Sequence, residues 1–193
     1  GTPSYVYSRA TLERHAKAYT ESFKSMNGLV CFSVKALSNI SILKVLKQCG
    51  CGFDIVSGGE LHRALLAGAD PQKIIFSGVG KSKAEMAAGI KSNILSFNVE
   101  SESELMALEE VAKELNAMAP VAIRFNPGVD AGGHEFTKTG RKSDKFGVSI
   151  DETMRLTDKC IKSNNLNIVG LTCHIGSQIS ELEKFKEAAA QSL

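Results

Sequence analysis

The feature that most constrains the fold is a repeated alternation between short apolar runs and amphipathic helical stretches. The apolar runs are rich in Val, Ile and Phe, as buried parallel strands are. The stretches between them repeat their apolar residues at helical spacing. Short connections between such strands and helices predict a parallel sheet with helices outside it. We expect strands at residues 30–36, 52–57, 73–79, 95–100, 121–127 and 167–176, with an extra helix at about 10–26 before the first strand.

Two α/β architectures share this pattern, the doubly wound open sheet and the (β/α)₈ barrel. No glycine fingerprint of a dinucleotide-binding turn favours the open sheet. A complete barrel usually takes about 250 residues, whereas this chain has 193. No linker or low-complexity segment divides the chain. We therefore predict an α/β fold, a partial TIM-type barrel with about six of the eight βα units, in one domain over 1–193.

Helix ends carry their own signals. Gly68 followed by Asp70 and Pro71 predicts that a helix stops there. Four Ser-x-x-Glu sequences match the capping box, in which a hydroxyl and a carboxylate satisfy free backbone N–H groups reciprocally. These boxes are Ser82 with Glu85, Ser101 with Glu104, Ser149 with Glu152, and Ser180 with Glu183.

Composition excludes several classes of partner. The formal net charge is +2 and no basic stripe is interleaved with aromatic residues, so nucleic-acid binding is not expected. No apolar run approaches the roughly 20 residues of a membrane span. The five cysteines lie mostly within apolar runs and lack a second ligand pair at metal spacing, which predicts reduced thiols, no metal site and a cytoplasmic location.

Polar side chains gather where the predicted strands end, which is where α/β folds bind their ligands. The steps between them are 19, 23, 23 and 24 residues, followed by a step of 50 that leaves room for a polar, glycine-rich loop at 126–147. Regular spacing predicts that these groups share one rim. They are Lys35, Asp54, Ser77, Glu100, Arg124 with Asn126, and His174.

Lys35 is the most informative of them. Alternation along a strand predicts Ser33 and Lys35 on one face, and Phe32 and Val34 on the other. Partial desolvation of such a lysine favours the neutral amine, which can attack a carbonyl and form an imine. The alternative is a lysine that simply reaches solvent from the rim.

The other polar groups have two interpretations each. Asp54 lies inside a strand and needs a partner, for which Lys35 is available, and Arg124 either shares that network or forms a structural ion pair. Glu60 belongs to a site or only to the first turn of a helix. His174 is a catalytic imidazole or a packing residue. A segment resembling a phosphate-binding loop, 75–82, lacks its first glycine, so its Lys81 is interpreted as part of a helix start.

Blocks of the sequence resemble the diaminopimelate decarboxylases, which belong to the alanine-racemase-like, barrel-bearing class of pyridoxal-phosphate enzymes. The block that contains Lys35 and the block "HIGSQ" are shared with ornithine and arginine decarboxylases, whereas the "NPGVDAGGH" block is more specific to the diaminopimelate branch. The blocks stand in the family's order at 1–8, 30–39, 50–61, 74–82, 97–105, 123–148 and 170–179.

This resemblance implies roles for individual residues toward pyridoxal 5'-phosphate. Lys35 would condense with the cofactor aldehyde, His174 would stack on the pyridine ring, and Ser177 would bind the phosphate. The polar network around the ring would contain Asp54, Glu60 and Arg124.

The resemblance also implies an activity and missing parts. The activity is decarboxylation of meso-diaminopimelate to L-lysine and CO₂, the last step of lysine biosynthesis, by a homodimeric parent enzyme. The alternatives are another basic amino acid as substrate (ornithine, arginine or carboxynorspermidine) or a non-catalytic homologue that binds the cofactor. In this family the later barrel strands and a C-terminal β-domain complete the site, so 1–193 alone is expected to be inactive.

Overall fold

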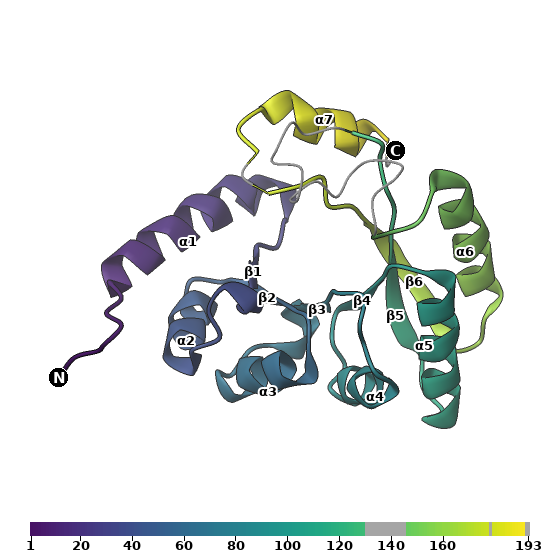
Figure 1. Ribbon diagram of the computed structural model, residues 1–193, viewed down its shortest axis with the longest axis horizontal. Helices are drawn as coiled ribbons and strands as arrows, with labels where there is room; N and C mark the ends of the chain where they lie inside the picture. The colour runs from purple at the N-terminus through teal and green to yellow at the C-terminus, as the bar shows by residue number, and fades with distance from the viewer. Residues whose placement is uncertain (130–145, 178, 192–193) are drawn as a thin grey trace. The chain divides into compact units, whose positions relative to one another are not determined.

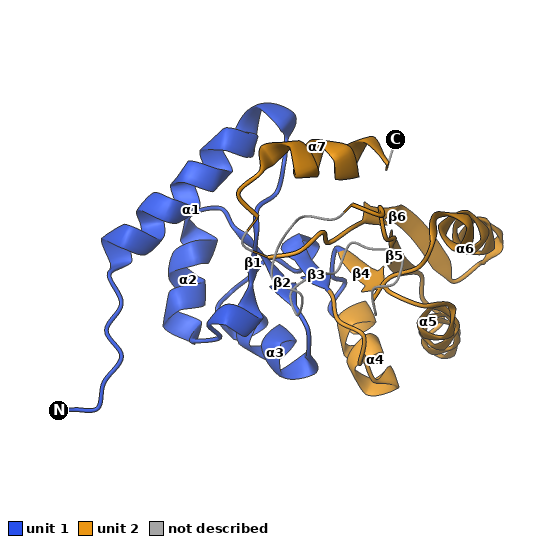
Figure 2. Cartoon of the chain, turned by 45° about the horizontal axis from the view of Figure 1, so that its top comes forward, with its two compact units in different colours: residues 1–76, 92–95 blue, residues 77–91, 96–193 orange. Residues whose placement is uncertain are grey.

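The computed structural model describes residues 1–129, 146–177 and 179–191. The chain divides into two compact units, drawn in blue and orange in Figure 2. The first unit contains residues 1–76 and 92–95, and the second contains 77–91 and 96–193.

The first unit is built on three parallel strands in the order β1, β2, β3. Ser33 lies opposite Asp54 in the register of β1 and β2, and Asp54 lies opposite Ile75 of β3. Helix α2 contacts both α1 and α3, and α3 contacts β2 (Figure 1). The elements are α1 (Arg9–Phe23), η1 (Lys24–Met26), β1 (Cys31–Ser33), η2 (Val34–Ala36), α2 (Ile40–Gln48), β2 (Gly52–Ile55), α3 (Gly58–Leu66), η3 (Pro71–Lys73) and β3 (Ile74–Phe76).

The core of the first unit comes from the apolar runs of its strands together with the inner faces of its helices. Phe53 and Ile55 of β2 and Leu43 of α2 are fully buried, as are Ile74 and Phe76 of β3. Burial on both faces of a strand explains why the sequence consists of continuous apolar runs rather than an alternating pattern.

The second unit also contains three parallel strands, in the order β4, β5, β6. Helices α5 and α6 both contact β5, and α4 lies against α5 (Figure 1). Val129, Ile175 and Ala188 form a small buried cluster under α7. The elements are α4 (Lys83–Lys91), β4 (Ser96–Val99), α5 (Glu102–Glu114), β5 (Ala119–Arg124), α6 (Ile150–Lys162), β6 (Leu166–Thr172) and α7 (Leu182–Ala190).

Several strands end earlier than their apolar runs predict. The run 30–36 forms a strand only at Cys31–Ser33, and Val34–Ala36 form a 3₁₀ turn instead. The run 167–176 ends as a strand at Thr172. Apolar residues persist past the strand because the connecting turn also packs into the core, and Val34 is fully buried within its turn.

The four predicted capping boxes have different outcomes. Ser82 and Glu85 form the full reciprocal pair, while Ser101 and Ser149 accept the expected N–H at 3.2 Å. The prediction for Ser180 is wrong, because α7 begins after Glu181, whose side chain makes no capping hydrogen bond. Glu183 pairs with Lys186 at 2.6 Å instead of bonding back to a cap.

Two further observations bear on the expectations from composition. All five cysteines are free thiols. No helix in the described ranges is both long and apolar enough to cross a membrane.

Candidate active site

In the first unit, Asp54 is held by Ser33 rather than by Lys35. The Ser33 hydroxyl donates to Asp54 Oδ2 at 3.1 Å across the β1–β2 pair. Within the described part of the chain, no hydrogen bond or ion pair involves Lys35. The predicted pairing of Lys35 with Asp54 is therefore wrong. The cause is the 3₁₀ turn after Ser33, which takes Lys35 off the alternating pattern of a strand.

Lys35 nevertheless lies directly beyond the carboxyl end of β1, in a turn that contacts β2. Its side chain is exposed. The partial burial that the sequence predicted for this lysine is therefore not seen. What the fold provides is an amine at a strand end with no competing partner among the described residues.

Glu60 is engaged in the start of α3. Its carboxylate Oε2 accepts the Val56 N–H at 2.8 Å, and its own N–H donates to the Ser57 hydroxyl at 3.2 Å. The Ser57 hydroxyl thus caps one of the free N–H groups at the helix start, and the Glu60 carboxylate binds the residue before the cap. The contacts of Glu60 therefore support the interpretation that it belongs to the start of the helix.

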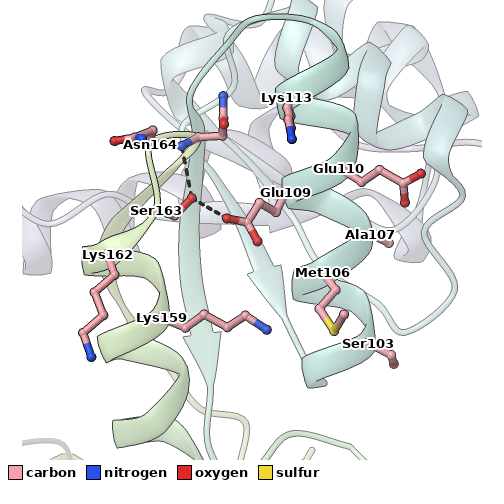
Figure 3. A pocket seen from close by; sticks show the side chains of 11 residues that line it. Ser103, Met106, Ala107, Glu109, Glu110, Lys113, Lys159, Lys162, Ser163 and Asn164 are labelled. Atoms are coloured by element: carbon pink, nitrogen blue, oxygen red, sulfur yellow. Dashed lines mark hydrogen bonds between the residues drawn. The ribbon is translucent and has the colours of Figure 1, made fainter.

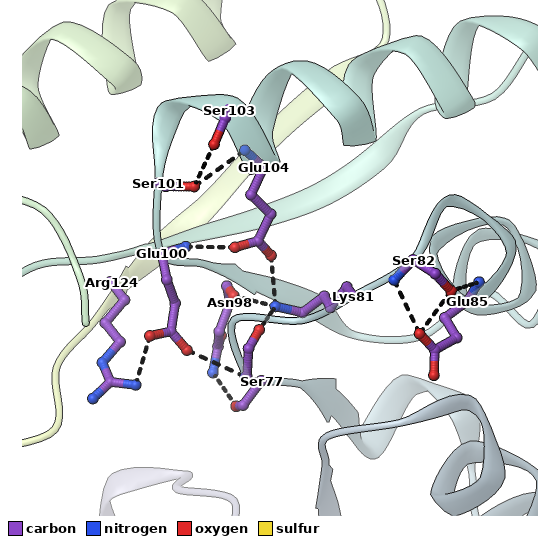
Figure 4. Close-up of polar contacts among 11 residues, drawn as sticks. Ser77, Lys81, Ser82, Glu85, Asn98, Glu100, Ser101, Ser103, Glu104 and Arg124 are labelled. Atoms are coloured by element: carbon purple, nitrogen blue, oxygen red, sulfur yellow. Dashed lines mark hydrogen bonds and ion pairs between the residues drawn. The ribbon is translucent and has the colours of Figure 1, made fainter. Parts of the chain in front are cut away.

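In the second unit, Arg124 forms a buried ion pair with Glu100. Arg124 Nη1 donates to Glu100 Oε2 at 2.9 Å, and the two side chains are 13% and 2% exposed (Figure 4). Glu100 follows β4, and Arg124 is the last residue of the neighbouring strand β5. The ion-pair interpretation of Arg124 holds, with Glu100 as its partner rather than Asp54 or Lys35.

A second buried ion pair lies beside the first one. Lys81 Nζ donates to Glu104 Oε1 at 2.6 Å, and the two side chains are 1% and 9% exposed (Figure 4). Burial raises the pKa of the Glu104 carboxyl above its usual range, and the charge of Lys81 opposes this rise. Interpreting Lys81 only as part of a helix start missed this pair.

The carboxyl end of β5 is closed by the segment that follows residue 145. Asn126 N–H donates to the Val148 carbonyl at 2.9 Å, and Val148 N–H donates to the Arg124 carbonyl at 3.0 Å. The Phe146 ring lies under the guanidinium, with its centroid 5.8 Å from the Arg124 Cζ. Of the large loop predicted at 126–147, residues 130–145 lie outside the described residues.

Two buried polar atoms at this strand end have no hydrogen-bond partner in the parts of the chain that the structure describes. They are Arg124 Nε and Asn126 Oδ1. A buried polar atom without a partner is costly. Such atoms fit a place where a polar ligand completes the site.

His174 and Ser177 lie beyond the carboxyl end of β6. Thr172, the last residue of β6, is the register partner of Arg124, and its carbonyl accepts the Phe125 N–H at 2.9 Å. His174 follows two residues later, and both His174 and Ser177 are exposed. Two neighbouring strands of one unit, β5 and β6, therefore have polar residues at or beyond their carboxyl ends: Arg124, Asn126, His174 and Ser177.

A groove of about 880 Å³ between α5 and α6 is a competing location (Figure 3). Its inner wall includes the Ser163 hydroxyl, which donates to Glu109 at 2.5 Å and accepts the Asn165 N–H at 3.1 Å. The groove is lined by α5, by the last turn of α6 and by the segment that immediately precedes β6, and not by residues at the carboxyl ends of strands. Sites in α/β folds form at the carboxyl ends, so this groove is not the candidate active site.

Comparison with known proteins decides the family. Residues 9–193 match the family described as "Pyridoxal-dependent decarboxylase, pyridoxal binding domain". The chain belongs to this decarboxylase family. The family resemblance predicted from the sequence blocks is confirmed.

Two curated relatives are diaminopimelate decarboxylases. The chain is 48% identical to the enzyme of Pseudomonas aeruginosa over 193 residues, covering 100% of this chain and 46% of the relative. It is 48% identical to that of Haemophilus influenzae over 188 residues, covering 97% and 45%. The chain therefore spans about half the length of the relatives it matches.

A solved structure gives the same result for the fold. A point mutant of diaminopimelate decarboxylase from Helicobacter pylori, complexed with L-lysine, superposes with a TM-score of 0.96 at 42% identity, covering 100% of this chain and 49% of that one. The predicted α/β fold, part of the TIM-type barrel of these decarboxylases, is confirmed.

Three residues at or near the strand ends had no predicted role toward a ligand. Glu100 was noted only as a strand-end carboxylate, Asn126 only as a neighbour of Arg124, and Lys81 only as a helix start. The regular spacing of strand ends was the signal that pointed to Glu100. No local signal identifies the buried ion pair of Lys81, because Glu104 lies 23 residues away and only the Gly78 carbonyl is close in sequence.

Proposed function

We propose that the protein containing this chain is a pyridoxal-phosphate-dependent carboxy-lyase that converts meso-diaminopimelate to L-lysine and CO₂. The observation that carries this proposal is 48% identity, over the whole chain, to a protein named diaminopimelate decarboxylase. The relative from Helicobacter pylori, whose structure contains L-lysine, supports the product. The 193 residues would be the first part of the cofactor-binding barrel domain, with a further β-domain elsewhere in the protein.

The residues at the strand ends fit pyridoxal 5'-phosphate by their chemistry. Lys35 offers the aldehyde an exposed amine that no described residue engages, and Ser177 offers an exposed hydroxyl for the phosphate. Arg124 Nε and Asn126 Oδ1 offer a donor and an acceptor that no group in the described ranges satisfies. When bound, the cofactor supplies a conjugated pyridinium that accepts the electron pair left when CO₂ departs.

Each side chain is assigned one task in this proposal. Lys35 would hold the cofactor through its amine. His174 orients the ring by stacking, which restricts the reacting groups to a productive arrangement. Asp54 and Arg124 provide charges of opposite sign near the ring, each already fixed by a neighbour, Ser33 and Glu100 respectively.

Glu60 has a more indirect task. Because its carboxylate accepts the Val56 N–H, it acts from a fixed place at the start of α3. We therefore propose that Glu60 belongs to the polar network around the cofactor while its carboxylate stays bound at the start of α3. A homodimeric parent enzyme in the cytoplasm, acting on a small-molecule amino acid, completes the proposal.

The test uses the full-length protein and its Lys35→Ala variant. Lys35 contacts no described partner, so the variant should fold. The wild type should develop the visible absorption of the lysine-bound cofactor and release CO₂ from meso-diaminopimelate, and Lys35→Ala should do neither. Lys44→Ala, which removes an exposed lysine of α2, is the matched control and should behave as wild type.

Two results would contradict the proposal. If Lys35→Ala keeps both the absorption and CO₂ release, the assignment of the lysine is wrong. If the wild type binds the cofactor but prefers ornithine, arginine or carboxynorspermidine in a substrate panel, the substrate is wrong.

A further inference from the structure

Lys81 connects three elements of the second unit through one buried ammonium group. Its Nζ donates to the Gly78 carbonyl at 2.6 Å, to the Asn98 carbonyl at 2.8 Å and to Glu104 Oε1 at 2.6 Å (Figure 4). These acceptors lie in the loop before α4, on β4 and in the first turn of α5. A lysine has three N–H donors, and each of them has an acceptor here.

The groups that Lys81 holds are the ones that fix Glu100. Gly78, whose carbonyl binds Lys81, donates its N–H to Glu100 Oε1 at 3.2 Å. Glu104, whose Oε1 binds Lys81, accepts the Glu100 N–H on Oε2 at 3.0 Å. The Glu100 main chain and carboxylate are therefore both anchored by partners of Lys81.

Glu100 in turn holds Arg124. Its other oxygen, Oε2, accepts from Arg124 Nη1 at 2.9 Å. The sequence of contacts from Lys81 to Arg124 is continuous and buried, since the Lys81, Glu100 and Glu104 side chains are 1%, 2% and 9% exposed. The network contains two cations, Lys81 and Arg124, and two carboxylates, Glu100 and Glu104, so its charges balance.

Stability alone is a weak reason to bury such a pair. The cost of removing two charges from water often exceeds their attraction, and apolar replacements of similar size are frequently neutral or stabilising. A buried ion pair is better suited to fixing one arrangement of the groups around it.

We propose that Lys81 is a positioning residue for the Arg124 guanidinium. It acts through Gly78, Glu104 and Glu100, and it touches neither cofactor nor substrate. The proposal rests on the proposed function, because it assigns the Arg124 guanidinium to the polar network around pyridoxal phosphate.

Loss of Lys81 should produce a characteristic dependence on pH. The charged groups facing Glu104 are Lys81 from the loop before α4 and Glu100 from the end of β4, with Arg124 beyond Glu100. Without Lys81, burial and the Glu100 charge raise the pKa of Glu104 further. At low pH a neutral Glu104 leaves the Glu100–Arg124 pair intact, whereas at high pH a second carboxylate competes for it.

The experiment titrates the full-length apo-protein with pyridoxal 5'-phosphate and follows visible absorption between about pH 6 and pH 9. Lys81→Met should weaken cofactor binding about tenfold at neutral pH, similar to the loss of residues that orient metal ligands. The ratio of its Kd to the wild-type Kd should rise with pH.

Lys83→Met is the matched control. Lys83, two residues later and in α4, also forms an ion pair with α5, through Glu110 at 2.6 Å, but both side chains are 55% exposed. This variant removes the same charge and an ion pair to the same helix, α5, without reaching Glu100. Its cofactor Kd and its pH profile should equal those of the wild type.

The double variant Lys81→Met/Glu104→Gln keeps the proposal testable if the single variant fails to fold. It removes both charges of the buried pair, so no uncompensated carboxylate remains. It should bind the cofactor about tenfold more weakly than wild type at every pH, because Asn98 and Gly78 are no longer held. The rise of the Kd ratio with pH should disappear.

Two results overturn the inference. The first is a wild-type Kd in the double variant, or a wild-type Kd and pH profile in a folded Lys81→Met variant. Either outcome would mean that Lys81 only stabilises the loop. If the wild type itself binds no pyridoxal 5'-phosphate, it is the proposed function that fails.

Discussion

Arg124 and Glu100 join the carboxyl ends of two neighbouring strands through one buried hydrogen-bonded ion pair, 2.9 Å long. The guanidinium also lies over the Phe146 ring, whose centroid is 5.8 Å from Cζ. The Arg124 Nε is buried, and none of the described residues accepts from it. The guanidinium is thus fixed in place while one donor stays available.

Removing the charge of Glu100 should destabilise the protein strongly. Glu100→Gln leaves the Arg124 cation buried without its counter-charge, and breaking a buried pair in this way costs about 3 kcal/mol or more. Urea unfolding of the full-length protein measures the loss. Glu102→Gln is the matched control, because Glu102 pairs with Arg155 at the surface, where such pairs contribute little. An equal effect of both substitutions would show that the buried Glu100–Arg124 pair contributes no more to the free energy of unfolding than a surface pair.

Gly147 should tolerate alanine poorly. It has φ +81°, and a Cβ at this position would lie 2.9 Å from Asn126 Oδ1 and 3.0 Å from the Arg124 carbonyl. Left-handed backbone costs a residue with a Cβ about 1–2 kcal/mol, and crowding costs about 1–3 kcal/mol more. Gly147→Ala should therefore reduce the free energy of unfolding by roughly 2–5 kcal/mol and weaken cofactor binding.

Gly128→Ala separates these two contributions. Gly128 has φ +73°, but no atom of the described residues lies within 4 Å of the place that a Cβ would occupy. Its substitution should cost only the backbone strain, about 1–2 kcal/mol. Equal losses for Gly128→Ala and Gly147→Ala, measured by the same urea unfolding, would mean that crowding against Asn126 and Arg124 is unimportant.

The fold could be predicted because its signals are local. Apolar runs and helical periodicity are properties of neighbouring residues, and they located each of the strands β1 to β6. The geometry after β1 was not predictable in this way. Val34 is apolar and buried, which is typical of a strand, yet its backbone is already in a 3₁₀ turn that moves Lys35 off the alternation.

The candidate site was predictable only in part for a related reason. Lys35, Arg124 and His174 could be predicted as candidates because strand ends recur at regular spacing. The ion-pair partners of Arg124 and Lys81 lie 24 and 23 positions away in the sequence. Whether a lysine in a turn is exposed or buried against a carboxylate is decided by such long-range packing, which no local pattern encodes.

Ser82→Ala should destabilise the start of α4. The Ser82 hydroxyl accepts the Glu85 N–H at 3.3 Å, and Glu85 accepts both the N–H and the hydroxyl of Ser82. Loss of a capping side chain costs about 1 kcal/mol. Ser180→Ala has the same chemistry in a capping-box sequence that does not cap α7, and it should leave the thermal unfolding midpoint unchanged. A loss in both variants would mean that Ser180 caps the helix in solution.

Two of the thiols should resist alkylation in the folded protein. Burial raises the pKa of Cys31 to about 12 and that of Cys160 to about 11. At pH 8 the reactive thiolate is then only about one part in 10⁴ of Cys31 and one part in 10³ of Cys160. Burial also raises the pKa of Cys173, but this residue is exposed. Iodoacetamide at pH 8 should therefore modify Cys173 before Cys31 and Cys160, and peptide mass spectrometry identifies the modified sites.

The dependence on pH has a definite sign. A thiol whose pKa is raised on folding is neutral in the folded state at pH 7, and stability is lost as pH rises from the ordinary value of 9.0 toward about 12. Native labelling of Cys31 should therefore increase about tenfold for each pH unit above 8, until unfolding exposes all five thiols. Fast labelling of Cys31 at pH 8, with Cys173 left unmodified, would contradict both the burial of the Cys31 thiol in β1 and the exposure of the β6 end.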